Sequence, residues 1–274
     1  MPIVFNVSRD GVDADTTDRN KLVVTSLDTE LKIIKKNSGT VSVGAGDSDA
    51  TLKQHHGLGY APAFLSYFEY PDDLGRYWLS GTGLGTAGLS AYRSQSAVTN
   101  DLIELTANRS DAGPGAFSQN FAYYLFDQPA GMAPSGSGKP IGYQESAQGI
   151  IVSKEGFDAD KAKIYEQQFN SNTDYLKYHL TIPGKIVFDT TNDGEAIEII
   201  THNLGYIPIF KVYAKAPTKS VYNPLPIGRV PQSFFSSAGA DKTNITINIG
   251  WVGGGGPGSV FPYRVVIFKN KMVI

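Results

Sequence analysis

The chain contains the same segments twice, in the same order, and this internal repeat limits its possible folds more than any other sequence feature. Residues 7–15 read VSRDGVDAD and residues 152–160 read VSKEGFDAD, with six of nine positions identical. Residues 56–67 and 202–213 share seven of twelve positions. Each copy spans about 125 residues, a common size for a single domain. The sequence therefore predicts a tandem duplication.

Shorter matches extend this alignment along the chain and place the domain boundaries. They pair Gly39 with Gly184, residues 113–115 with 256–258, and residues 123–126 with 265–268. Between the copies, the run PAGMAPSGSGKP that begins at Pro129 has the composition of a linker. We therefore expect domain A at 3–128, a Gly/Pro/Ser linker at 129–148, and domain B at 149–274.

The residue patterns within each copy indicate short strands. In the second copy, segments rich in Ile, Val, Tyr, Phe and Thr are bounded by Gly, Pro, Asn and Asp. They are 175–181, 185–189, 196–202, 209–215, 244–249 and 263–268. Only Asp158–Phe169 has a helical pattern, with Asp158 as a possible N-cap. This pattern predicts an all-β protein of two tandem β-sandwich domains, with Ig-like or jelly-roll-like topology.

Composition argues against several functional classes. The 24 Lys and Arg residues against 26 Asp and Glu give a net charge of −2, without the basic excess typical of nucleic-acid binders. There is no apolar run near 20 residues, so we expect no membrane span. The absence of cysteine excludes thiol catalysis, thiolate metal sites and disulfides. The first residues lack the pattern of a secretory signal peptide, so none is expected.

Short motifs that resemble catalytic or metal sites lack the context that those sites require. The glycines of residues 83–88 match a dinucleotide fingerprint but lie in an all-β pattern. Residues 189–194 match the start of a calcium loop, but Ile200 stands where a glutamate ligand is needed. His56 and His202 recur without a second ligand, which favours a structural role. We therefore expect no enzyme activity, cofactor or metal, although a carboxylate pair for glycoside hydrolysis stays open.

The copies diverge completely at 68–101 and 214–243, and these segments supply the candidate contact residues. They carry large aromatics beside arginine, a combination that protein contact surfaces use. The predicted interface residues are Tyr77, Trp78, Tyr92, Arg93, Tyr222, Arg229, Phe234 and Phe235. The alternative is that these side chains cap the ends of their own sandwiches.

The recurring segment His-x-Leu-Gly-Tyr-x-Pro-x-Phe, followed by a strand that ends in Tyr, resembles β-domains of tailed-phage virion proteins. The closing run YRVVIFKN at 263–270 is similar to the last strand of such domains. The resemblance implies a non-enzymatic component of a virion tail, fibre, collar or capsid decoration. Such a protein would be made in the host cytoplasm and would contact copies of itself and other virion proteins.

A second hypothesis is a carbohydrate-binding or receptor-binding adhesion module. Tyr77, Trp78 and Tyr92 could stack on the sugars of a host-surface glycan, with Asp72, Asp73 or Arg76 as hydrogen-bonding neighbours. A depolymerase is a third class, and it would require a pair of carboxylates in a cleft.

Overall fold

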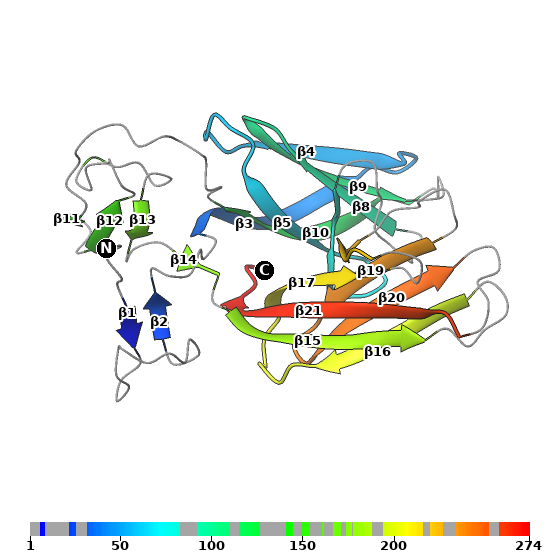
Figure 1. Ribbon diagram of the computed structural model, residues 1–274. Helices are drawn as coiled ribbons and strands as arrows, with labels where there is room; N and C mark the ends of the chain where they lie inside the picture. Colours follow the sequence, from blue (N-terminus) through cyan, green and yellow to red (C-terminus); the bar gives the residue numbers. More distant parts are fainter. Residues whose placement is uncertain are drawn as a thin grey trace. The chain divides into compact units, whose positions relative to one another are not determined.

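Figure 1 shows the computed structural model of the chain. The structure describes residues 6–8, 22–25, 32–82, 92–109, 115–126, 141–144, 149–153, 161, 167–170, 174–176, 178–187, 194–215, 220–226, 234–251 and 258–274.

The described part of the chain is all-β, which confirms the predicted fold class. It contains 21 strands, and within these ranges no helix is long and apolar enough to cross a membrane. The strands divide between two compact units, one made of residues 35–125 and 177–274 and the other of 1–34 and 126–176. In the larger unit we refer to residues 35–125 as the first half and to 177–274 as the second half.

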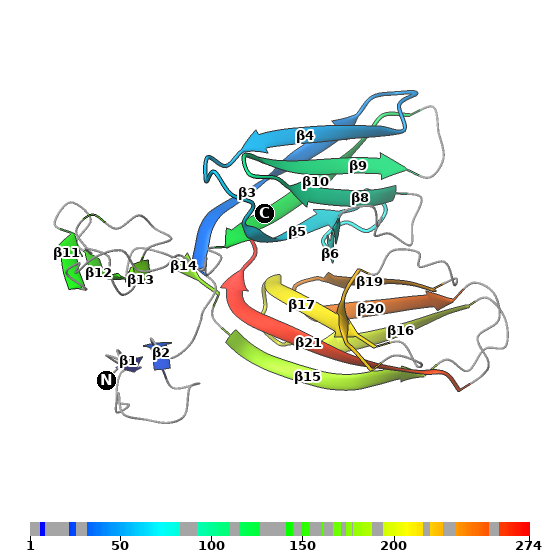
Figure 2. The same ribbon diagram turned by 45° about the horizontal axis from the view of Figure 1, so that its top comes forward.

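The first half is a sandwich of two sheets, with strand orders β3-β10-β5-β6 and β4-β9-β8-β7 (Figure 2). The strand bounds are β3 Lys32–Val43, β4 Asp49–His55, β5 Ala63–Glu69, β6 Tyr77–Leu79, β7 Gly81–Thr82, β8 Tyr92–Val98, β9 Leu102–Arg109 and β10 Phe117–Phe126. A hydrogen bond of 2.6 Å between the hydroxyls of Ser66 and Ser96 links the inner faces of the two sheets.

The second half is built in the same way, from the sheet β15-β21-β17-β18 and the strands β16, β20 and β19. The bounds are β15 Tyr178–Val187, β16 Gly194–Thr201, β17 Pro208–Ala214, β18 Asn223–Pro224, β19 Phe234–Ala240, β20 Asn244–Trp251 and β21 Val260–Lys271. Its core consists of fully buried aliphatic and aromatic side chains from the inner faces, which are Phe210, Val212, Ile245, Ile247, Ile249, Phe261, Val265 and Ile267.

The two halves correspond strand for strand. The order β3-β10-β5-β6 matches β15-β21-β17-β18, and β4-β9-β8 matches β16-β20-β19. The halves differ at the strand that follows in this second sheet. In the first half β7 pairs with β8, whereas in the second half the equivalent strand β19 pairs with β6 of the first half. One sheet, in which β3, β10, β5, β6, β19, β20 and β16 follow one another, therefore runs through both halves. A duplication would produce this correspondence, although the duplication itself stays an inference from the sequence.

The structure explains why Gly39 and Gly184 recur in the two copies. Each glycine lies beneath an aromatic ring from the neighbouring central strand. A Cβ on Gly39 would lie 3.0 Å from the ring of Phe121, and a Cβ on Gly184 would meet the ring of Tyr263. Tyr263 is paired directly with Gly184. A glycine on the outer strand therefore makes room for a large aromatic on the central strand in both halves.

Two predictions of secondary structure are wrong in part. The helix expected over Asp158–Phe169 does not reach its predicted end, because Gln167–Asn170 forms strand β13 and pairs with strand β12 (Gly149–Ser153). Of its other residues only Lys161, in a turn, is described. The segments 175–181 and 185–189 were expected as separate strands, but Tyr178–Val187 is one strand, β15. Pro183 is tolerated within it because β15 lies at a sheet edge, where a missing backbone donor is not needed.

The smaller unit contains short antiparallel pairings. β1 Asn6–Ser8 pairs with β2 Leu22–Thr25, and β12 Gly149–Ser153 pairs with β11 Ile141–Gln144 and β13. β14 Asp174–Tyr175 pairs with the first residues of β3. The domain boundaries expected at 128 and 149 stay predictions, because much of 127–148 lies outside the described residues.

Candidate functional site

The most elaborate contact among the described residues is the joint at which the first half meets the second. Here β6 adds to the edge of β19, with Tyr77 opposite Ala240 and Trp78 opposite Gly239. A Cβ on Gly239 would lie 2.6 Å from the indole ring, so the ring lies directly on the glycine backbone. Tyr77 and Trp78 are only 5% and 8% exposed. The joint therefore combines edge pairing of two strands with aromatic burial.

Tyr67 of β5 fixes the joint at a second point. Its hydroxyl donates to the carbonyl of Phe210 at 2.6 Å and accepts the N–H of the same residue at 3.2 Å. On this edge of β17, strand β18 pairs only with Tyr213 and Ala214, so no strand reaches Phe210. The Tyr67 hydroxyl therefore takes the place of a strand partner for the backbone of Phe210. Burial raises the pKa of Tyr67 well above its usual value, which keeps the hydroxyl protonated as a donor.

Tyr124 of β10 makes a third contact across the joint. Its hydroxyl accepts the backbone N–H of Val273 at 2.6 Å, so the first half holds the C-terminal residues of the second. The ring lies edge-on to Tyr67, with 6.3 Å between ring centroids. Burial is the main cause that raises the pKa of Tyr124 to about 12. These neutral phenols satisfy backbone groups that would otherwise be buried without partners.

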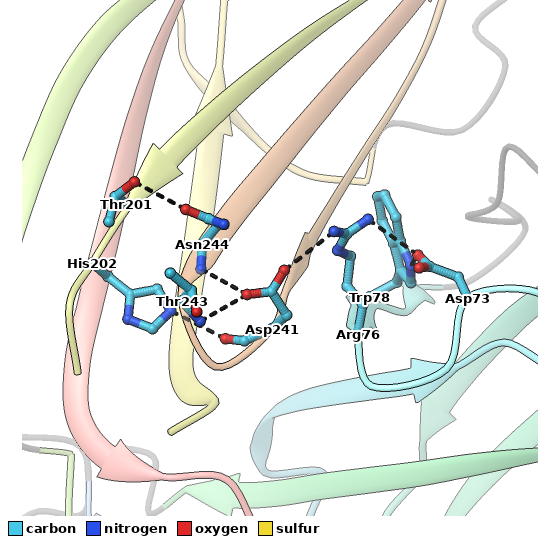
Figure 3. Close-up of polar contacts among 8 residues, drawn as sticks. All are labelled: Asp73, Arg76, Trp78, Thr201, His202, Asp241, Thr243 and Asn244. Carbon is cyan, nitrogen blue, oxygen red and sulfur yellow. Dashed lines mark hydrogen bonds and ion pairs between the residues drawn. The ribbon is translucent and has the colours of Figure 1, made fainter. Parts of the chain in front are cut away.

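An ionic contact lies at the rim of the joint (Figure 3). The Arg76 guanidinium lies 3.2 Å from a carboxylate oxygen of Asp241 and 3.5 Å from one of Asp73. Asp73 also accepts the indole N–H of Trp78 at 2.7 Å. Partial burial disfavours the charged form of Asp241 and by itself raises its pKa. Hydrogen bonds from the backbone N–H groups of Asn244 and Thr243, together with Arg76, outweigh this effect, so the pKa of Asp241 is lowered. One guanidinium therefore bridges two carboxylates, one from each half, at the rim.

The recurring histidines have a structural role, as the sequence predicts. His56 Nε2 lies 3.0 Å from the carbonyl of Thr99, and His202 Nε2 lies 3.1 Å from that of Asp241. In the second half the Nδ1 atom of His202 accepts the N–H of Leu204 at 3.2 Å, and in the first half Nδ1 of His56 accepts the N–H of Leu58 at 3.3 Å. A carbonyl only accepts and an amide only donates, so the proton is on Nε2. Each histidine thereby ties one turn to the next hairpin.

The backbone of the same turns explains the recurring glycines. Gly59 and Gly205 have φ angles of 75° and 73°, in the left-handed region that glycine adopts without strain. Two residues earlier, Gly57 has φ 70° and Asn203 has φ 56°. Asparagine is among the few other residues that tolerate this region. Gly59 and Gly205 therefore hold a turn conformation that a side chain with a Cβ would strain.

The predicted contact residues of the first half lie in different environments. Tyr77 and Trp78 contact the second half of the same chain, and their predicted contact with other molecules stays a prediction. Tyr92 is half-buried and packs on Phe117, with 4.9 Å between ring centroids, whereas Arg93 is exposed. Because Trp78 is only 8% exposed and one face of its ring lies on Gly239, the ring offers no open face for stacking on a sugar.

The predicted residues of the second half are described only in part. Tyr222 is half-buried, and the Arg264 guanidinium lies 4.6 Å from its ring centroid. Phe234 and Phe235 lie in β19 opposite Trp251 and Gly250, and their side chains lie outside the described residues. Arg229 also lies outside the described residues.

Tyr67 and Tyr124, which make hydrogen bonds across the joint, are not among the predicted contact residues. Tyr67 and Tyr213 occupy equivalent positions in the repeat, but only Tyr67 is fully buried. The pairing of β6 with β19 connects residues more than 150 positions apart, and no local pattern signals it. The sequence signal for Arg76 and Trp78 is their position in a segment where the two copies of the repeat diverge.

No group of three or more His, Asp or Glu side chains in the described ranges is arranged to hold a metal ion. No family model, curated protein or solved structure matches the chain. The resemblance to tailed-phage virion proteins therefore stays an expectation from its motifs.

Proposed function

We propose that the chain is a non-enzymatic structural component of a tailed-phage virion, part of the tail, fibre, collar or capsid decoration. It assembles through contacts with copies of itself and with other virion proteins. Three features support this proposal: the virion-type motif in both copies, the repeated β-sandwich, and a joint in which one half extends the sheet of the other. The joint demonstrates that edge-to-edge addition is compatible with this fold.

The observation that carries the proposal is the outer edge strand β16. It lies at the end of its sheet, where it pairs with β20 and no described strand pairs with its other edge. Ile197 and Ile199 on its outer face are 58% and 64% exposed. An open edge with exposed aliphatic side chains is a template for pairing with another chain.

The first half provides the matched comparison. The positions equivalent to Ile197 and Ile199 are Thr51 and Lys53 of β4. Thr51 shares a hydrogen bond of 2.8 Å with Thr106, and Lys53 forms an ion pair of 2.9 Å with Glu104. The same strand position is therefore polar in one half and aliphatic in the other, as expected if only the second half meets a neighbour here.

The mass of the full chain in solution, measured by light scattering after size exclusion, tests this assembly. We expect a multimer for the natural chain and a folded monomer for the double variant Ile197→Thr, Ile199→Lys, which introduces the residues of the first half. The exchange Thr51→Ser serves as a control that leaves the multimer intact. A natural chain that is monomeric at all concentrations would contradict the proposal.

A further inference from the structure

The sheet β15-β21-β17-β18 carries positive charge without negative charge. None of its four strands contains Asp or Glu, although the chain as a whole has slightly more acidic than basic residues. Four cations follow its outward-facing positions: Lys185 on β15, Lys211 on β17, Lys215 directly after β17, and Arg264 on β21. We refer to these four residues as the basic face.

The cations of the basic face lie close together. Arg264 is paired directly with Tyr213, which lies between Lys211 and Lys215 along β17. Lys185 is paired with Pro262, and the N–H of Lys215 donates to the carbonyl of that proline at 2.9 Å. Residues two apart on a strand lie on the same side, and neighbouring strands are about 4.8 Å apart. The four charges therefore share one surface.

No carboxylate neutralises these charges within the described residues. The only contacts found there for the side chains of Lys211, Lys215 and Arg264 are with tyrosine rings. Lys211 lies 5.2 Å from the ring centroid of Tyr213, and Arg264 and Lys215 lie 4.6 and 5.9 Å from that of Tyr222. Contacts of this kind orient a cation without cancelling its charge.

The equivalent surface of the first half has no cation at the positions of Arg264, Lys211 and Lys215. Ala122 occupies the position of Arg264, and Leu65 and Glu69 occupy those of Lys211 and Lys215. Ala122 is fully buried, and Tyr124, two residues further along β10, contacts the second half through Val273. The same face of the fold is therefore an internal contact in one half and an exposed cationic surface in the other.

We propose that the basic face binds an acidic polysaccharide, a glycan with carboxylate or sulfate groups along its length. Its charge complements four unneutralised cations. A protein partner fits less well, because lysine is depleted at protein interfaces and the centre of this face is cationic. Single-stranded nucleic acid also fits less well, because its bases stack on open aromatic rings and Arg264 covers a face of Tyr222. This site is separate from the β16 edge and does not depend on assembly.

Binding of the full chain to a heparin oligosaccharide and to oligogalacturonate, with neutral dextran as the reference, tests this proposal. At about 50 mM salt we expect binding to at least one acidic glycan, weaker binding as salt rises, and none to dextran. The double variant Arg264→Ala, Lys215→Glu introduces the first-half residues and should weaken binding at least about tenfold. If this variant melts at a lower temperature than the natural chain, the double variant Lys185→Thr, Lys211→Ala replaces it with the same expectation.

The control variant Lys36→Ala, Lys53→Ala removes two exposed lysines from the first half and should change affinity less than about twofold. An equal loss of binding in this control would overturn the assignment to the basic face. Failure of both acidic glycans to bind at low salt would overturn the proposal. Equally tight binding of oligo-dT or poly-L-glutamate would also overturn it, by assigning the face to a different class of partner.

Discussion

The hydroxyl of Tyr67 satisfies both backbone polar groups of Phe210, accepting its N–H at 3.2 Å and donating to its carbonyl at 2.6 Å. One side chain of the first half thus replaces a strand partner for β17 of the second half. The equivalent residue of the second half, Tyr213, is half-exposed instead. The halves are therefore related in topology but differ in the contacts that they make at the joint, and this asymmetry yields direct predictions.

Removing the hydroxyl of Tyr67 should destabilise the larger unit. In Tyr67→Phe the backbone groups of Phe210 stay buried without partners, at a cost of about 1–3 kcal/mol in the free energy of unfolding. Denaturant unfolding of the full chain measures this. The matched control Tyr213→Phe removes a half-exposed hydroxyl and should cost less than about 0.5 kcal/mol. Equal losses in the two variants would show that the bridge contributes no stability.

Stability should fall at alkaline pH. Burial raises the pKa of Tyr67 and raises that of Tyr124 to about 12, so the folded state keeps protons that the unfolded chain releases near pH 10. This contribution is fully present below about pH 10 and is lost as pH rises through the folded values. Each such tyrosine makes the free energy of unfolding fall more steeply with pH, by up to about 1.4 kcal/mol per pH unit.

Unfolding measured at several pH values from 8 to about 12 tests this sign. Tyr67→Phe should show a shallower decline above pH 10 than the natural chain, because it has lost one of the buried protons. A stability that rises with pH in this range, or a decline of equal slope in the variant, would contradict the assignment.

A β-branched residue at Gly205 should destabilise the second half. Gly205 has φ 73°, and Gly205→Val should therefore cost at least about 1 kcal/mol. The control Asn203→Gly changes a residue at φ 56° to one that adopts this region freely, so stability should change by only a few tenths of a kcal/mol. An unchanged melting transition in Gly205→Val would disprove the turn.

A methyl group at Gly239 should weaken the joint between the halves. The added Cβ would lie 2.6 Å from the Trp78 ring, which must shift away from β19. Overpacking of this kind costs about 1–3 kcal/mol, and Trp78 fluorescence should report greater exposure. Gly115→Ala, where a Cβ would meet no atom within 4 Å, is the matched control and should have little effect. A native-like spectrum in Gly239→Ala would contradict this packing.

Local features of the fold were predictable from the sequence because their causes are local. Segments such as Asn244–Ile249 alternate with period two, and β20 indeed spans Asn244–Trp251. The recurrence of His202 and Gly205 in an identical context indicated a structural turn, and the hydrogen bonds and φ angle agree. Residues that are identical in the two copies, such as these, thus have structural roles that both halves share.

The joint was not predictable because it depends on pairing between distant residues. Trp78 and Arg76 were identified only as aromatic and basic residues in a divergent segment. Their contacts with Gly239 and Asp241 follow from the addition of β6 to β19, which no local pattern specifies. For the same reason, a helical pattern at Gln167–Phe169 was overridden by pairing with β12.

Proteomics of purified virions, combined with imaging of particles that carry a labelled copy of the chain, tests the proposed virion role most directly. We predict that the chain is present in several copies per particle, and that the label marks a fixed position on the tail, fibre, collar or capsid surface. A chain that is absent from purified particles, while present in the infected host cell, would contradict this function.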